Sequence, residues 1–199
     1  MKTHTPKLIF FLALSLVTAC KDNTSITPID KSSKSVSPIQ ISHTFSPGAQ
    51  PKNVIFVIGD GTGINQISAL EFYKEHHVYY DDFPIVGLSK VSSTSLITDS
   101  AAAGTAMACG EKTFNKAIGV DAQGNDLPNL IELNEQLGGA NGLIATSSIT
   151  HATPACFYAH HNDRNDHEII ASFLPKSSVD FFAGPGLKYF NNQIGRAHV

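Results

Sequence analysis

The chain has 199 residues, a formal net charge of −3 and a hydrophobic fraction of 42%. This length predicts about one domain, and the mildly acidic balance excludes a strongly basic protein that wraps nucleic acid, so no nucleic acid is expected as a specific partner. The apolar fraction is too high for a disordered chain and too low for a polytopic membrane protein, and three cysteines are too few for a disulfide scaffold.

Residues 1–19 have the pattern of a secretory signal peptide. Lys2 and Lys7 precede an apolar run over residues 8–17, which is too short to span a hydrocarbon core that needs about 20 residues. A buried core helix is the alternative interpretation of this run. The pattern favours the signal peptide and predicts that the protein is exported.

Small residues lead from the apolar run directly to Cys20. Residues 16–20, Leu-Val-Thr-Ala-Cys, resemble the lipobox of bacterial lipoproteins, in which the cysteine becomes the acylated N-terminus. The resemblance implies that lipidated Cys20 anchors the protein to a bacterial membrane, in the periplasm or at the cell surface, and that more than one acyl chain is needed for stable anchoring. A soluble periplasmic protein cleaved after Ala19 is the alternative.

Residues 20–51 are expected to form a disordered tether. Of the 31 residues in 21–51, 14 are Ser, Thr or Pro and one, Phe45, is aromatic. Such a segment cannot bury enough apolar surface to offset the entropy lost on ordering. A flexible tether of this length would hold a folded domain close to a membrane.

The last six residues, Ile-Gly-Arg-Ala-His-Val, are what a common sequencing-library adapter encodes when it is read in frame. We therefore expect residues 193–199 to be adapter read-through, and His198 is not counted as a candidate ligand. The folded part is then expected over residues 52–192.

Predicted strands and helices alternate along the folded part. Apolar runs predict strands over residues 53–58, 85–91, 142–146 and 179–183. Helices are predicted over residues 63–74, 100–109, 127–137 and 166–174. This alternation predicts an α/β protein, a three-layer α/β/α sandwich with a mostly parallel sheet.

Asp60 follows the first predicted strand and lies between Gly59 and Gly61. Ligands of such sheets bind at the carboxyl ends of strands, and the glycines let the backbone bend there, so Asp60 is a candidate binding residue. An aspartate of an ordinary turn is the alternative. The glycines do not match a dinucleotide-binding motif, because its third glycine would fall on Ile64 or Gln66.

Ser100 stands at the start of a predicted helix made almost entirely of small residues. The free N–H groups at a helix N-terminus attract anions, and small side chains leave room for a bulky anion and metals. Asp99 or Ser100 could equally be a simple N-cap. The local sequence does not decide between these two interpretations.

Four ordered motifs resemble the bacterial alkaline phosphatase family. They are Gly-Asp-Gly at 59–61, Asp-Ser-Ala at 99–101, His-Ala-Thr-Pro at 151–154 and Arg164, supported by residues 112–115 and 118–121. The resemblance runs from about residue 53 to residue 164. It implies that residues 52–192 form the N-terminal part of an alkaline phosphatase-like sandwich that is incomplete at its C-terminus.

The resemblance implies a catalytic role for three residues. Ser100 is similar to the nucleophile that forms a phosphoserine intermediate. Arg164 is similar to the arginine that grips two phosphate oxygens, for which its planar fork is suited, and Asp99 would orient it. A solvated charge at the start of a helix is the alternative for Arg164.

The resemblance also implies two zinc ions and one magnesium ion. Asp60 resembles the carboxylate shared between a zinc and a magnesium site, and Thr153 resembles a magnesium ligand. Family members have Asp or His at the position of His151, and with His the third site could hold zinc, unless this imidazole only binds site water. The family's remaining zinc ligands lie beyond Arg164, where this sequence has no matching motif.

The resemblance therefore implies hydrolysis of small-molecule phosphate monoesters, with the complete enzyme as a candidate homodimer. The chain alone is expected to be inactive because it lacks zinc ligands. The alternatives are a phosphodiesterase or sulfatase of the same superfamily and an inert surface-anchored fragment. A diesterase would more often use threonine in place of Ser100 and would not need Arg164.

Overall fold

The computed structural model describes residues 48, 51–74 and 77–190. The chain divides into two units, residues 1–40 and 41–199, and the described residues all belong to the second. The predicted signal peptide, Cys20, nearly all of the tether and residues 193–199 lie outside the described residues and stay predictions. No helix in the described ranges has the length and apolar character needed to cross a membrane.

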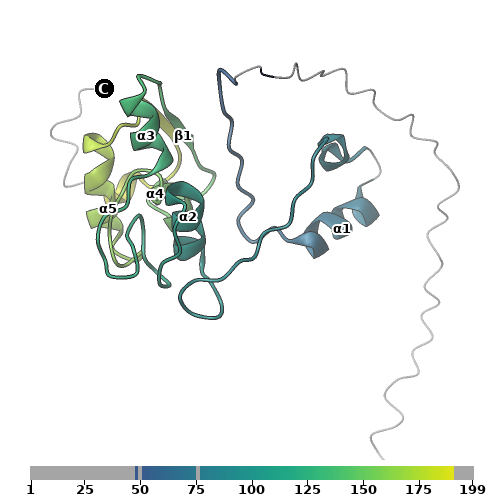
Figure 1. Cartoon of the computed structure of the whole chain (residues 1–199), viewed down its shortest axis with the longest axis horizontal. Coiled ribbons are helices and arrows are strands. Elements are labelled where there is room, and N and C mark those ends of the chain that lie inside the picture. The colour runs from purple at the N-terminus through teal and green to yellow at the C-terminus, as the bar shows by residue number, and fades with distance from the viewer. Residues whose placement is uncertain (1–47, 49–50, 75–76, 191–199) are drawn as a thin grey trace, which may run out of the picture. The chain divides into compact units, whose positions relative to one another are not determined.

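The described residues form short helices, 3-10 turns and two short strands (Figure 1). The helices are α1 (Ile64–Tyr73), α2 (Ser100–Cys109), α3 (Leu130–Gln136), α4 (Ala152–Ala155) and α5 (His167–Phe173), with 3-10 turns η1 (Tyr79–Asp82), η2 (Leu174–Lys176) and η3 (Leu187–Tyr189). The strands are β1 (Gly142–Ile144) and β2 (Phe181–Ala183). They pair in parallel, with Gly142 opposite Phe181. The α/β class and the four predicted helices are confirmed.

Two of the predicted strands, 53–58 and 85–91, do not form. Both segments lack strand structure, and the side chains of Val54, Ile55 and Val57 are more than four-fifths exposed. A strand needs a neighbour for its backbone hydrogen bonds, and the sheet within the described ranges consists of β1 and β2 alone. The apolar runs were therefore wrong as predictors of buried strands here.

Small residues let α2 and α4 approach closely. A Cβ at Gly104 would lie 2.9 Å from Sγ of Cys156 and 3.6 Å from Cα of Thr153. The Cys156 thiol is buried and donates to the carbonyl of Ala101 at 3.3 Å. Burial raises the pKa of this free thiol to about 12, so Cys156 acts as a small packing residue and not as a reactive group.

A capping box begins α3. Oδ1 of Asn129 accepts from the N–H groups of Ile131 and Glu132 at 3.0 and 3.1 Å, while Oε2 of Glu132 accepts from the N–H of Asn129 at 2.9 Å. This reciprocal arrangement satisfies N–H groups that have no partner within the helix. It also leaves the second oxygen of Glu132 available to a neighbouring side chain.

That neighbour is His160, whose ring lies between two acceptors. Nε2 is 3.0 Å from Oε1 of Glu132, and Nδ1 is 2.7 Å from the carbonyl oxygen of Gly119. Both partners accept hydrogen bonds, so each ring nitrogen needs a hydrogen to donate. An imidazole carries hydrogen on both nitrogens only when it is protonated. Burial alone would lower the pKa of His160, but these hydrogen bonds and the charges of Glu132 and Asp126 raise it above its ordinary value of 6.5.

Replacing Gly104 tests the close packing of α2 on α4. The added methyl group overpacks the contact, which costs about 1–3 kcal/mol of stability, whereas alanine favours the helix by about 1 kcal/mol relative to glycine. We therefore expect Gly104→Ala to lower the free energy of unfolding by about 1 kcal/mol. Urea unfolding measures this loss. The double variant Gly104→Ala/Cys156→Ala removes the clashing sulfur and should unfold closer to the parent. An unchanged midpoint in the single variant would contradict the prediction.

His160 should make the stability of the fold depend on pH. A group whose pKa is raised by folding stabilises the folded state fully below its unfolded pKa, and this contribution is lost as pH rises through the folded pKa. Between about pH 6 and about pH 9, the unfolding free energy should therefore fall more in the parent than in His160→Gln. Glu132→Gln is the matched control, since it keeps the capping box and removes the charge, and its pH dependence should lie between the two. Parallel curves for parent and His160→Gln would disprove this assignment.

Candidate active site

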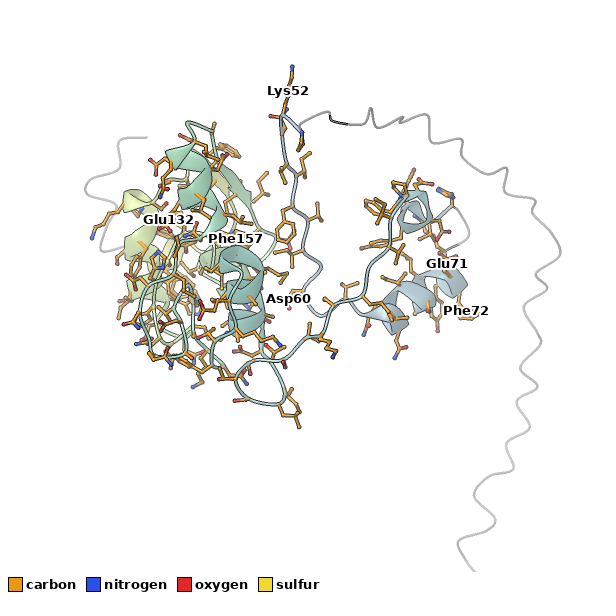
Figure 2. The ribbon with its side chains drawn as sticks, viewed as in Figure 1. Lys52, Asp60, Glu71, Phe72, Glu132 and Phe157 are labelled. Atoms are coloured by element: carbon orange, nitrogen blue, oxygen red, sulfur yellow. The ribbon has the colours of Figure 1, made fainter. Side chains whose placement is uncertain are left out.

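Asp60 accepts hydrogen bonds from two hydroxyl groups that come from distant parts of the chain. Oγ of Ser100 donates to Oδ1 of Asp60, and Oγ1 of Thr153 donates to Oδ2, each at 3.1 Å. Asp60 lies on the exposed turn after residues 53–58 (Figure 2), Ser100 is the first residue of α2 and Thr153 lies in α4. The structure thus brings together three of the predicted site residues.

The carboxylate of Asp99 accepts from three donors. Its Oδ1 accepts from the N–H of Ala102 at 2.9 Å, which caps α2. Its Oδ2 accepts from the N–H of Lys116 at 3.0 Å and from Nη1 of Arg164 at 3.3 Å. Asp99 is therefore the N-cap of α2 and also a direct partner of Arg164, so the two interpretations of this residue are compatible.

Arg164 extends between Asp99 and His151. Its Nη2 lies 3.2 Å from Nε2 of His151, and because arginine only donates, this imidazole nitrogen accepts. Burial lowers the pKa of His151, the charge of Arg164 lowers it further, and Asp60 opposes both. A neutral imidazole therefore faces the guanidinium.

Backbone pairing places Arg164. Ile118 and His161 exchange two backbone hydrogen bonds of 2.8 Å, and the N–H of Arg164 donates to the carbonyl of Lys116 at 3.0 Å. The φ angle of Lys116 is +75°. Lys116 cannot be identified from the sequence, because a lysine in Phe-Asn-Lys-Ala carries no signal for a left-handed backbone.

Other histidines near the site are held by protein partners. His160 bonds through both ring nitrogens, and Nε2 of His161 lies 2.7 Å from Asp166. Nδ1 of His167 lies 3.0 Å from Oγ1 of Thr150, in the segment that leads to α4. His167 was not singled out from the sequence, since only the fold brings it to Thr150.

The predicted metal ligands supply part of a coordination shell. The carboxylate of Asp60 and the hydroxyl of Thr153 are hard oxygen donors that suit magnesium, and the imidazole of His151 also suits zinc. Among the described residues, no group of three or more His, Cys, Asp and Glu side chains could hold a metal ion. The residues present therefore fit part of a metal site and do not complete a two-zinc centre.

The chain resembles known alkaline phosphatases over most of its length. It is 38% identical over 161 residues to alkaline phosphatase 4 of Bacillus subtilis, covering 73% of this chain and 35% of that protein. It is 35% identical over 168 residues to the repressible alkaline phosphatase of Saccharomyces cerevisiae, covering 76% and 29%. The chain thus spans about a third of the length of these relatives.

Solved structures give the same result. The alkaline phosphatase of the Antarctic bacterium TAB5 matches with a TM-score of 0.66 and 43% identity, covering 69% of this chain and 41% of that one. A cold-active alkaline phosphatase of a psychrophilic Shewanella species matches with a TM-score of 0.64 and 31% identity, covering 71% and 40%. The family model described as alkaline phosphatase matches residues 51–188. The chain therefore belongs to the alkaline phosphatase family.

Proposed function

We propose that the complete protein hydrolyses phosphate monoesters through a phosphoserine intermediate at Ser100. The observation that carries this proposal is the hydrogen-bonded group of Ser100, Asp60 and Thr153 next to the Asp99–Arg164 pair. A nucleophile and a guanidinium that binds phosphate oxygens are groups that phosphoryl transfer uses, and a carboxylate can ligate a metal ion. Membership of the alkaline phosphatase family supports a phosphomonoester hydrolase.

Ser100 would act as the nucleophile of the first of two in-line displacements. Its Oγ attacks phosphorus, the bond to the ester oxygen breaks, and the alcohol leaves with a proton. In the second displacement, water attacks the phosphoserine and releases phosphate and the free Ser100 hydroxyl. The position of Ser100 at the N-terminus of α2 favours the reaction, because free N–H groups and the helix dipole stabilise negative charge there.

Arg164 would bind two oxygens of the transferring phosphoryl group. Its contacts with Asp99 at 3.3 Å and His151 at 3.2 Å restrict the orientation of the guanidinium. A planar guanidinium in a fixed orientation can donate two parallel N–H hydrogen bonds to two phosphate oxygens. It then stabilises the charge of the transition state without further rearrangement. This arginine also favours a monoesterase over a diesterase.

The implied metals are two zinc ions and one magnesium ion. Asp60 would ligate both kinds of ion, and Thr153 would ligate magnesium. When bound, the metals supply positive charge that lowers the pKa of a serine hydroxyl or water and neutralises phosphate. Because the described residues offer only part of the ligands, we propose that the 199-residue chain alone is inactive.

His151 is proposed to decide which ion the third metal site prefers. Two TAB5 mutants in which a histidine is replaced by aspartate or glutamate are described with Mg bound in the M3 site. We propose that His151 takes the position of that histidine. Its imidazole would then favour zinc there, since nitrogen ligands suit zinc better than magnesium.

We also propose that the protein is exported and anchored to a bacterial membrane. An exported protein anchored through lipidated Cys20 would meet small-molecule phosphate monoesters outside the cytoplasm. The complete enzyme is proposed as a homodimer.

Ser100→Ala tests the nucleophile. In the complete gene product, supplied with zinc and magnesium, we expect it to reduce hydrolysis of p-nitrophenyl phosphate by at least about 1000-fold, because the oxygen that forms the intermediate is gone. Ser172→Ala is the control, since Ser172 lies in α5 and its hydroxyl donates to the carbonyl of Ile169. Undiminished hydrolysis by Ser100→Ala, or an inactive complete product, would refute the proposed function.

Arg164→Lys tests the bidentate grip on phosphate. Lysine keeps the charge but cannot hold two oxygens in one plane, and a lost charge-assisted hydrogen bond is worth about 1.5–3 kcal/mol. Inhibition by inorganic phosphate should therefore weaken by at least about ten-fold in both Arg164→Lys and Arg164→Ala. If Arg164→Lys binds phosphate as tightly as the parent, Arg164 acts only as a point charge and the bidentate role is wrong.

A further inference from the structure

Within the described ranges, Lys116 is the one residue other than glycine with a positive φ angle, +75°. In this left-handed region the Cβ atom crowds the backbone, so ordinary residues avoid it unless the surrounding structure holds them there. Lys116 lies next to the candidate active site, and the proposed reaction assigns no role to it. The unusual backbone conformation of Lys116 beside the candidate site therefore needs a physical explanation.

The backbone of Lys116 connects two residues of the site. Its N–H donates to Oδ2 of Asp99 at 3.0 Å, and its carbonyl accepts from the N–H of Arg164 at 3.0 Å. The φ angle sets the rotation between the N–H of a residue and the rest of that residue. With φ in the usual negative range, the N–H and the carbonyl of Lys116 could therefore not reach Asp99 and Arg164 at the same time, so at least one of the two hydrogen bonds would weaken.

The side chain of Lys116 does not explain the conformation. Its Nζ lies 3.7 Å from Oδ2 of Asp163, and the two side chains are 57% and 40% exposed. Ion pairs this exposed contribute little to stability. The preceding residue is held independently, because Nδ2 of Asn115 donates to the carbonyl of Ile97 at 2.9 Å. What Lys116 contributes therefore passes through its backbone.

We propose that Lys116 is a positioning residue of the phosphate site. Its left-handed backbone joins Asp99, the residue before Ser100, to the segment that carries Arg164, and so it sets where the guanidinium lies relative to the nucleophile. The catalytic consequence rests on the proposed phosphomonoesterase function. The backbone connection stands on the geometry alone.

Substitutions at position 116 separate the backbone from the side chain. Lys116→Gly and Lys116→Asn tolerate a positive φ, whereas Lys116→Ala removes the charge and keeps Cβ. Lys116→Val differs from Lys116→Ala only by two methyl groups, whose branching at Cβ disfavours the left-handed region. Lys116→Ala is therefore the matched control for Lys116→Val.

The variants are compared in the complete gene product with zinc and magnesium. We expect inhibition by inorganic phosphate to stay within about two-fold of the parent in the Gly, Asn and Ala variants, because the lost ion pair is exposed. In Lys116→Val it should weaken about ten-fold, with a matching rise in KM for p-nitrophenyl phosphate. Hydrogen exchange of the amides at positions 116 and 164 should be faster in Lys116→Val than in Lys116→Ala.

Equal phosphate inhibition and equal exchange in Lys116→Ala and Lys116→Val would overturn the proposal. A loss in Lys116→Gly that Lys116→Arg does not share would also overturn it, since the cation would then carry the role. Circular dichroism checks folding. If Lys116→Val does not fold, the proposal requires the amide at position 164 to be protected at least as well in Lys116→Gly as in Lys116→Ala, and weaker protection refutes it.

A parent without phosphatase activity, or one that is insensitive to Ser100→Ala, rejects the proposed function. In that case the exchange measurement still tests the backbone connection, because it requires no turnover.

Discussion

The arrangement of the site depends on the carboxylate of Asp99. Its two oxygens accept from the N-terminus of α2, the backbone of Lys116 and the guanidinium of Arg164. Hydrogen bonds to a charged acceptor are roughly twice as strong as neutral ones, so one side chain can hold three segments together. Because Asp99 directly precedes Ser100, the arginine that it holds must lie close to the hydroxyl at the start of α2.

The second constraint is how closely α2 and α4 approach each other. Gly104 and the alanines of α2 have little or no side-chain area to bury. Larger residues such as Ile118, Ile149 and Ile170 form most of the apolar core instead. In return, α4 brings Thr153 to the same carboxylate that Ser100 contacts. A larger side chain on α2 would add apolar burial and separate these hydroxyls, so the composition of the helix follows from the geometry of the site.

Local patterns in the sequence predicted the helices, and the motifs of the family resemblance named the candidate residues that the structure brings together. Local patterns failed where the outcome depends on distant partners. The run of small residues in α2 and the site motifs can be recognised in the sequence because each is a short contiguous segment. Residues 53–58 are apolar, but strand formation depends on a neighbour that periodicity does not reveal. The raised pKa of His160 and the left-handed backbone of Lys116 cannot be predicted from local patterns either, because each is imposed by acceptors or donors from other segments.

The two halves of the site are anchored to different degrees. Arg164 is tied through its own backbone to Lys116 and through its side chain to Asp99 and His151, and the segment next to it is paired with Ile118. Asp60 lies on an exposed turn and meets the rest of the site through two hydroxyl contacts. Backbone anchoring in a packed region restricts a side chain more than hydroxyl contacts at the surface do. Arg164, the candidate phosphate-binding residue, is therefore held by both backbone and side-chain contacts, whereas Asp60, a candidate metal ligand, is held by two hydroxyl contacts on an exposed turn.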